Sequence, residues 1–541
     1  MLRVLIAALV LNLMLVAPLW WRYGGPHVPL IALEAWVIAP LLMLVPAGRL
    51  RRFITVCVVA LAGLVSAAGL GDAATHTAFG RSLNLYLDVP LLRSVYHLLA
   101  GNAGDVVAVV VMTLGALLIL GVLLLISALL SPKRALSPRR LPGALALGLA
   151  LVALTLALLQ TQGVRVLPRS ALPMVDTTRF QFEQIVATHR ARQDFEALLE
   201  HEPLEPTALP GLAGRNVLVT FIESYGVTAL EKPRYAKLIG QTLDEMGERL
   251  DERDIQVVSG LMQAPIRGGQ SWLAHATILS GRWIDNQLWY RLMLDNGHSN
   301  LVEDFHATGQ RSLTVMPAIT LAWPEGIAYG FEEIRTANNI PYEGPPLNWV
   351  TMPDQYTLGY VARTQLDDAP LFAQITLISS HAPWTPILPV LENWSMIGDG
   401  TIYGPWENAA DPPEVLWQDL ERIRDHYGWS VNYSLASTAR FAERVVDDRT
   451  LMIVLGDHQP APLITGDDAS AAVPVHIISG DPALLEAFRA RGFVDGPIPA
   501  IDDPQGAPRM SEFRRWLQED FGEPSGQARE QNLQASTDDS P

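Results

Sequence analysis

Long apolar runs dominate the first 160 residues. Five of them are long enough to cross about 30 Å of hydrocarbon as helices rising about 1.5 Å per residue: 2–21, 28–48, 53–71, 105–130 and 141–160. Backbone groups in lipid must be hydrogen-bonded within their own segment, which favours helices. A signal peptide would account only for the first run, and no small-residue cleavage site follows it. The pattern therefore predicts a five-helix membrane domain over residues 1–160.

Basic residues are concentrated in alternate loops between these runs. Two loops carry them, with Arg49, Arg51 and Arg52 in one and Lys133, Arg134, Arg139 and Arg140 in the other. The remaining two loops are nearly neutral or acidic. Because Lys and Arg favour the cytoplasmic side, the N-terminus is expected inside, and an odd number of crossings places the rest of the chain outside. We therefore expect a multi-pass protein of the cell (inner) membrane with its larger part on the extracytoplasmic, or periplasmic, side.

The pattern changes after residue 210, where short apolar runs rich in β-branched residues alternate with segments of helical periodicity. The predicted strands are 216–222, 255–258, 312–316, 372–379, 450–455 and 473–478, and the predicted helices lie near 232–250, 297–308, 355–367, 413–426, 431–447 and 483–491. Such alternation indicates an α/β fold with a mostly parallel central sheet covered on both faces. This domain is expected over 211–521, after a juxtamembrane helical connector over 161–210. The polar residues 522–541 are expected to be a disordered tail.

Charge and cysteine content exclude several classes of protein. Residues 1–165 contain 12 Lys and Arg against 4 Asp and Glu, whereas the rest of the chain contains 27 against 52. The net charge of −17 argues against a nucleic-acid partner, which would need a basic face. Cys57 is the single cysteine, so neither an intrachain disulfide nor a cysteine zinc cluster can form.

Two predicted strands end in residues that bind metals. Glu223 directly follows strand 216–222, and the pair Asp457-His458 follows strand 450–455 after one glycine. Sites in open α/β sheets form beyond the carboxyl ends of strands, and carboxylate oxygens with an imidazole nitrogen suit Zn²⁺ or Mn²⁺. Taken singly, each motif also fits an ordinary cap or turn. Their occurrence at matching strand ends favours a metal site.

A glycine-rich segment, Arg267–Ser271, precedes a helix-like run that ends near Gly281. The glycines permit unusual backbone angles and close approach of a ligand. Ser271 is expected to cap this helix, whose free N–H groups favour a bound phosphate. An isolated serine here also fits a plain N-cap. Beside a metal ion, however, its hydroxyl would be activated as a nucleophile.

Together these motifs resemble the alkaline phosphatase/sulfatase superfamily, and within it the membrane-bound branch of lipoteichoic acid synthases and other phosphoglycerol transferases. That branch has five membrane helices followed by an extracytoplasmic sulfatase-like domain. Its strand-Glu-Ser motif is similar to the segment ending in Glu223, and its Asp-His metal pair to Asp457-His458. The interval from Ser271 to Gly281-Arg282 is similar to the sulfatase pattern C-x-P-S-R-x-x-x-L-x-G-R. The resemblance extends to about residue 500.

The resemblance implies a transferase with one divalent ion, Mn²⁺ with Zn²⁺ or Mg²⁺ as alternatives. Its ligands would be Glu223, Ser271, Asp457 and His458. Ser271 would attack a membrane phospholipid, release diacylglycerol and hold the phosphorylated headgroup, phosphoglycerol or a similar group, until a glycan or lipid acceptor takes it. His381 resembles the family's phosphate-binding or proton-donating His, and Trp323 resembles a headgroup-pocket Trp. From the residues alone, His381 also fits a turn and Trp323 a packing aromatic.

The sequence departs from the family pattern at several of these positions. The transferases mostly use Thr as nucleophile. An alternative alignment places this Thr at Gln270 instead of Ser271, but glutamine cannot act as a nucleophile. The acid and arginine that flank the phosphoglycerol pocket fall on Ala318 and Glu325, and a formylglycine sulfatase would need Pro and Arg where Leu273 and His275 stand. His275 fits either a packed helix or the site. The alternative functions are a phosphodiesterase or phosphatase that uses water as acceptor, and a catalytically silent lipid-binding regulator.

Overall fold

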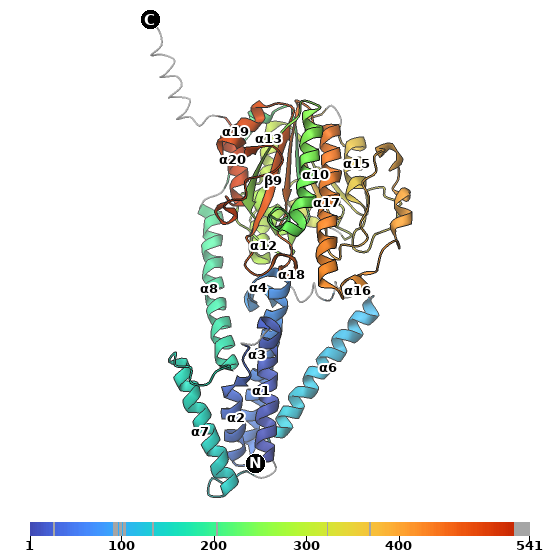
Figure 1. Ribbon diagram of the computed structural model, residues 1–541. Helices are drawn as coiled ribbons and strands as arrows, with labels where there is room; N and C mark the ends of the chain where they lie inside the picture. Colours follow the sequence, from blue (N-terminus) through green and yellow to red (C-terminus); the bar gives the residue numbers. More distant parts are fainter. Residues whose placement is uncertain are drawn as a thin grey trace. The chain divides into compact units, whose positions relative to one another are not determined.

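The chain forms two compact units in this computed structural model, Met1–Asp194 and Phe195–Pro541 (Figure 1). The described residues are 1–24, 28–89, 96, 100, 104–131, 135–201, 204–321, 323–366 and 369–523. The expected tail over 522–541 lies outside them from residue 524 onward. The two units are described separately below.

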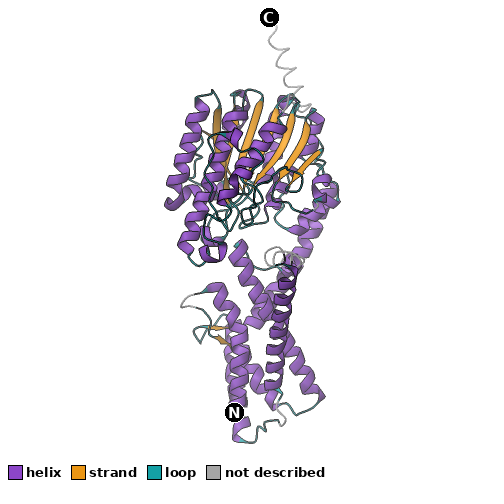
Figure 2. Cartoon of the chain, turned by 90° about the vertical axis from the view of Figure 1, so that its right-hand side faces the viewer, coloured by secondary structure: helices purple, strands orange, loops and turns teal. Residues whose placement is uncertain are grey.

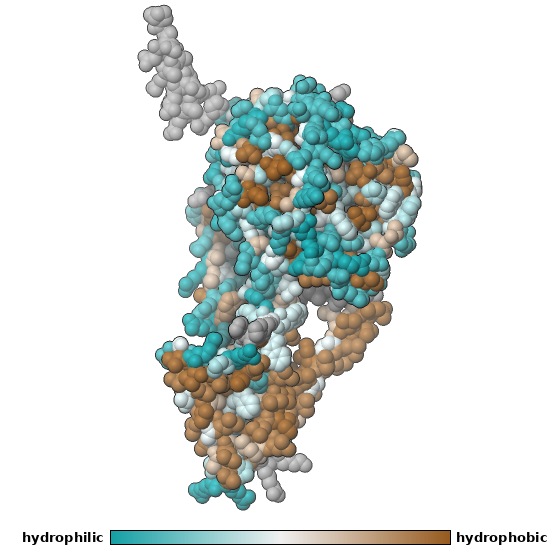
Figure 3. Space-filling model, viewed as in Figure 1, coloured by the Kyte–Doolittle hydropathy of each residue, from teal (hydrophilic) through white to brown (hydrophobic). Residues whose placement is uncertain are grey.

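Apolar helices make up the N-terminal unit, and their side chains form the brown surface in Figure 3. The elements are α1 (Leu2–Tyr23), β1 (Ile31–Ala32), α2 (Leu33–Leu44), α3 (Arg49–Phe79), α4 (Leu85–Asp88), α6 (Asp105–Leu130), α7 (Leu141–Thr161), β2 (Ser170–Ala171) and the start of α8 (Pro173–His201). Among the described residues, α1, α3, α6 and α7 are the four helices long and apolar enough to cross a membrane. This agrees with four of the five expected spans.

The expected span over 28–48 is not confirmed, because α2 has only 12 residues. Such a helix is about 18 Å long at 1.5 Å per residue, short of the hydrocarbon thickness. Two local features limit it. Ile31 and Ala32 pair with β2 as a short parallel ladder, and Val45 is extended because it precedes Pro46.

Glu34 of α2 holds the first turn of α8. Its Oε1 accepts hydrogen bonds from the N–H groups of Met174, at 3.0 Å, and Val175, at 3.3 Å. A carboxylate at a helix N-terminus satisfies free N–H groups and complements the helix dipole. Through Oε1 this buried side chain has a structural role, whereas its Oε2 has no hydrogen-bond partner among the described residues.

Among the described residues of the second unit, eight strands form one mixed sheet (Figure 2). In spatial order they are β10 (Val494–Asp495), β4 (Gln256–Gln263), β9 (Ala472–Ser479), β8 (Thr450–Gly456), β3 (Asn216–Ile222), β7 (Leu371–Leu377), β5 (Arg311–Met316) and β6 (Glu333–Thr336). The run from β8 to β6 is parallel, whereas β9, β4 and β10 pair antiparallel. The predicted parallel arrangement therefore holds for the half that carries β3 and β8. The chain joins β8 to β9 with only the short α18 (Pro462–Thr465) between them, and strands joined without a crossover helix run antiparallel.

Helices cover both faces of this sheet, as Figure 2 shows in purple on either side of the orange strands. In the described residues, the further helices of this unit are α9 (Thr228–Glu231), α10 (Pro233–Asp251), α11 (Ser271–Ser280), α12 (Gln287–Asp295), α13 (Leu301–Thr308), α14 (Pro324–Ala328), α15 (Asp354–Thr364), α16 (Pro413–Leu416), α17 (Leu420–Val445), α19 (Ala483–Ala490) and α20 (Phe513–Phe521). Successive residues of β3 enter opposite layers: Leu218 belongs to a buried cluster that includes residues of α10, α15 and α17, whereas Val219 belongs to one that includes residues of α11, α13 and α20. Alternation of this kind buries both faces of a strand.

Candidate metal centre and active site

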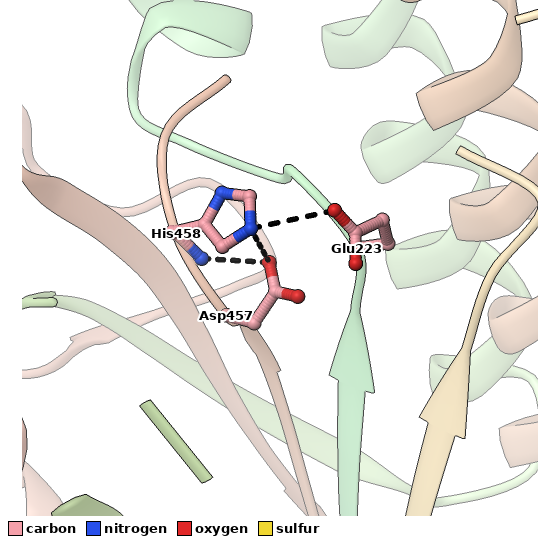
Figure 4. A group of neighbouring side chains, drawn as sticks. All are labelled: Glu223, Asp457 and His458. Carbon is pink, nitrogen blue, oxygen red and sulfur yellow. Dashed lines mark hydrogen bonds and ion pairs between the residues drawn. The ribbon is translucent and has the colours of Figure 1, made fainter. Parts of the chain in front are cut away.

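Glu223, Asp457 and His458 lie together at the carboxyl ends of β3 and β8 (Figure 4). These strands are hydrogen-bonded neighbours, with Ile222 opposite Gly456, so the residues that follow them emerge side by side. His458 Nε2 lies 3.4 Å from Glu223 Oε1 and 3.8 Å from Asp457 Oδ1. The ligand atoms of the three residues lie within 4.8 Å of one another, and all three side chains are buried. The sequence prediction therefore selected residues that the fold brings together.

The two oxygens of the Asp457 carboxylate have different surroundings. Oδ1 accepts hydrogen bonds from the N–H groups of Ser224, at 2.8 Å, and His458, at 2.7 Å. Oδ2 is buried and has no hydrogen-bond partner among the described residues. Ser224 itself has a φ of 57°, a strained conformation for a non-glycine residue that is held here at the site. An unpartnered buried carboxylate oxygen beside an imidazole is what a bound cation would satisfy.

Ser271 lies against the same cluster rather than capping its helix as expected. It is the first residue of α11, and its Oγ donates to Glu223 Oε2 at 2.9 Å and lies 3.2 Å from His458 Nε2. The preceding Gly268 and Gln270 have φ values of 77° and 67°, and the N–H of Gly268 donates to the carbonyl of Gln459. This left-handed backbone turns the chain so that the start of α11 meets the residues after β8.

The charges of the cluster shift one another's pKa values. Burial opposes ionisation of Glu223, but the charge and hydrogen bond of His458 outweigh it and hold the Glu223 pKa below its usual value. Burial, together with the Glu223 carboxylate, raises the pKa of Asp457 to about 8. Burial also opposes protonation of His458, yet the two carboxylates raise its pKa to about 9. Two buried carboxylates thus share a single cationic side chain.

A cavity of ≈ 410 Å³ opens beside Ser271, and both remaining predicted site residues line it. His381 follows β7, and its ring stacks on Trp349 with centroids 5.9 Å apart. Trp323 precedes α14 and lies 6.5 Å from the ring of Tyr329, which also lines the cavity. All six residues selected from the sequence therefore lie at one site or on the wall of its cavity.

His275 lines this cavity one turn beyond Ser271. Its ring packs on Phe221 with centroids 4.2 Å apart, and burial lowers its pKa to about 3. Among the described residues, neither ring nitrogen has a hydrogen-bond partner. The neutral imidazole thus offers one donor and one acceptor toward whatever occupies the cavity.

Sequence reasoning missed Gln374 and Thr376 of β7, which also line the cavity. The signal was present, because these are the polar residues of an otherwise apolar strand, two positions apart and thus on one face. Gln374 Oε1 is buried without a hydrogen-bond partner among the described residues. Tyr290 of α12 was missed as well, and no local pattern distinguishes it from a core aromatic.

No protein-family model matches the chain, and no curated protein matches it. Among solved structures, it is similar to the lipoteichoic acid synthase LtaP from Listeria monocytogenes, with 10% identity, 62% of this chain and 78% of that chain covered, and a TM-score of 0.38. It is similar to the periplasmic domain of EptC from Escherichia coli in complex with Zn, with 13% identity, 59% and 86% covered, and a TM-score of 0.37. It is also similar to the integral membrane lipooligosaccharide phosphoethanolamine transferase EptA from Neisseria meningitidis, with 12% identity, 95% of both chains covered, and a TM-score of 0.44. Similarity at this level assigns no substrate or residue role.

Proposed function

We propose that the chain is a membrane-anchored, metal-dependent transferase that moves a phosphorylated headgroup, phosphoglycerol or a similar group, from a membrane phospholipid to a glycan or lipid acceptor. The observation that supports this most is the Ser271 hydroxyl, 2.9 Å from Glu223 Oε2 and 3.2 Å from His458 Nε2, at the wall of a headgroup-sized cavity. A hydroxyl beside carboxylate and imidazole groups that could bind a metal ion suits phosphoryl transfer through a covalent intermediate.

The residues at the strand ends fit a divalent cation. Glu223, Ser271, Asp457 and His458 would hold it, with oxygen and nitrogen donors suited to Mn²⁺, Zn²⁺ or Mg²⁺. The unpartnered Oδ2 of Asp457 is the atom whose environment a cation would complete. When bound, such an ion supplies stabilisation of negative charge on phosphoryl oxygens and favours the ionised serine.

The proposed reaction consists of two displacements at phosphorus, and different residues of the chain act in each. In the first, Ser271 Oγ bonds to the phosphorus of the donor phosphodiester, its proton leaving toward Glu223 Oε2, which already accepts its hydrogen bond. The bond from phosphorus to the diacylglycerol oxygen breaks, and His381 on the cavity wall is placed to give that oxygen a proton. In the second, an acceptor hydroxyl bonds to phosphorus and gives its proton to His381, and the bond to Ser271 Oγ breaks as that oxygen takes back the proton held by Glu223. Trp323 would pack against the headgroup during both steps.

The membrane anchor gives this reaction a physical basis, because a tethered site meets a bilayer-confined donor at high effective concentration. We propose a membrane domain over 1–160, a connector over 161–210 and a catalytic domain over 211–521 on the extracytoplasmic side. The extended residues on either side of α2 would complete the fifth crossing, which an inside N-terminus and an outside catalytic domain require.

A labelling experiment tests the proposal. Membranes containing the chain receive phosphatidylglycerol or phosphatidylethanolamine labelled in the headgroup, and label is followed into glycan, lipid and water-soluble fractions. Transfer into glycan or lipid that Ser271→Ala abolishes supports the transferase. Label released only as a water-soluble headgroup would identify a hydrolase, and no metal- or Ser271-dependent release would leave a lipid-binding regulator.

A further inference from the structure

A second cavity, also of ≈ 410 Å³, lies wholly within the N-terminal unit. It is enclosed by the end of α1, the last turns of α3, the residues that follow α7 and the first turns of α8, with Leu19, Asp72, Gln160, Arg169 and Thr177 among its lining residues. None of its lining residues belongs to the Ser271 site. The cavity is therefore a separate feature of the helical unit.

Arginines give this cavity an excess of positive charge. Arg22, Arg165 and Arg169 line it, against the carboxylates of Asp72 and Asp176. Arg22 is committed to Asp72 at 3.1 Å, and Asp176 lies close enough to Arg165 for their charges to interact. The guanidinium groups of Arg165 and Arg169 are exposed and make no hydrogen bond or close ion pair within the described part of the chain. Guanidinium groups left open in this way match the paired oxygens of a phosphate.

The position of Arg169 is built into the local backbone. Its φ is 57°, in the left-handed region that arginine rarely adopts, and its carbonyl accepts hydrogen bonds from the N–H groups of Leu30 and Ile31. The next residue, Ser170, donates through its hydroxyl to Gln160 Oε1 at 2.7 Å. Strained conformations of this kind persist where the surrounding structure fixes them, often at ligand sites. Arg169 is thus held at the rim of the cavity by the β1–β2 ladder.

On the proposed membrane placement of α1, the cavity would lie at the level of the lipid headgroups. Trp20, Trp21 and Tyr23, all exposed, mark the same end of α1, and such aromatic residues gather at membrane interfaces. Leu19 and Phe180 add apolar surface to its wall. Figure 3 shows the brown apolar surface of these helices giving way to teal polar residues near their ends. Apolar wall and open arginines together fit an amphiphile with an anionic head.

We propose that this cavity binds the phosphate of an anionic membrane phospholipid, in contact with Arg165 and Arg169. The site rests on the proposed membrane placement of α1, α3 and α7 but not on the chemistry of Ser271. It would hold a lipid at the membrane surface independently of turnover. A free phosphate ion shares the recognised chemistry, so the experiment separates the two sources.

Native mass spectrometry of the full-length chain in detergent tests this site, with Ser271→Ala as background so that no lipid is consumed. Short-chain phosphatidylglycerol is expected to bind about tenfold more tightly than phosphatidylcholine. The double variant Arg165→Gln with Arg169→Gln is expected to abolish that preference. The matched control is Arg139→Gln with Arg140→Gln. It removes two exposed charges just before the start of α7, at the other end of that helix from the cavity, and should keep the preference for phosphatidylglycerol.

Three results would overturn the proposal. One is an unchanged lipid preference in the Arg165/Arg169 variant, and another is equal loss in the Arg139/Arg140 control. The third is displacement of the lipid by an equal concentration of inorganic phosphate, which would assign the cavity to the free ion. If the glutamine variant melts early, Arg165→Lys with Arg169→Lys keeps the charge but removes the planar fork, and a partial loss of preference is then expected.

Discussion

Two buried carboxylate clusters in the second unit differ in how completely they are neutralised. Asp304 of α13 has no exposed surface, and Arg514 of α20 contacts both of its oxygens, at 2.7 and 2.9 Å. The N–H of Thr207 and the side chain of Gln518 complete its hydrogen bonds. At the ends of β3 and β8, by contrast, Glu223 and Asp457 share His458, and one oxygen of Asp457 has no partner among the described residues.

The difference is between a buried carboxylate that the chain itself neutralises and a pair of carboxylates that the proposed cation would neutralise. A buried carboxylate is costly unless it is paired and hydrogen-bonded, and the Asp304–Arg514 pair meets both conditions within the chain. Glu223 and Asp457 meet them only in part, and Glu223 lines the same cavity as Ser271. Such incomplete pairing persists where a ligand or cation completes it.

Removing the Ser271 hydroxyl should have the largest effect. Ser271→Ala is expected to lower headgroup release from a labelled phospholipid by roughly 10⁴-fold, because the nucleophile is lost. The matched control is Ser395→Ala, which removes an exposed serine hydroxyl outside the cavity and should leave headgroup release unchanged. Equal activity of wild type and Ser271→Ala, measured by the same release assay, would remove the nucleophile from the account.

Breaking the structural pair should cost stability rather than chemistry. Arg514→Met leaves Asp304 buried without its cation and should lower the free energy of unfolding by about 3–5 kcal/mol. Arg515→Met, which removes an exposed arginine paired with Glu512 at 3.2 Å, should change it by less than about 0.5 kcal/mol. Thermal denaturation of the full-length chain in detergent measures both. Similar melting of the two variants would show that the buried pair contributes little.

His476 is a third buried polar group, and it should make the free energy of unfolding depend on pH. Burial lowers the pKa of His476 to about 4, below the value near 6.5 in the unfolded chain, and its ring nitrogens contact Ser259 and Tyr225. Between pH 6.5 and 4, the unfolded chain binds a proton at His476 that the folded chain does not bind. The free energy of unfolding should therefore fall by about 3 kcal/mol as the pH is lowered from 6.5 to 4. His476→Gln should therefore flatten the stability profile between pH 6.5 and 4. An unchanged slope in denaturation experiments would contradict the assignment.

His275 gives the smallest predicted effect and tests the functional side of the comparison. His275→Leu removes a buried imidazole that has no partner among the described residues, so stability should stay level or rise. Headgroup release should fall by about tenfold if the imidazole contacts the occupant of the cavity. Full activity with unchanged stability would make His275 a packing residue.

The site was more predictable from sequence than the surrounding topology. Glu223, Asp457 and His458 follow strands whose apolar runs are evident locally, and β3 and β8 pair in parallel as expected. The antiparallel pairing of β9 depends on how the chain returns after β8, which periodicity does not encode. Two predicted helices over 413–426 and 431–447 became largely the single α17, which continues through Gly428, where close packing against Tyr235 leaves no room for a side chain. The Asp304–Arg514 pair joins residues 210 positions apart, beyond any local signal.

The central claim is that Glu223, Ser271, Asp457 and His458 hold one divalent cation. Metal analysis of the purified full-length chain, stripped with chelator and reloaded with Mn²⁺, Zn²⁺ or Mg²⁺, tests it most directly. The account predicts about one tightly held ion per chain in the wild type and its loss in Asp457→Asn combined with His458→Gln. An equal ion content in wild type and variant, or none in either, would contradict it.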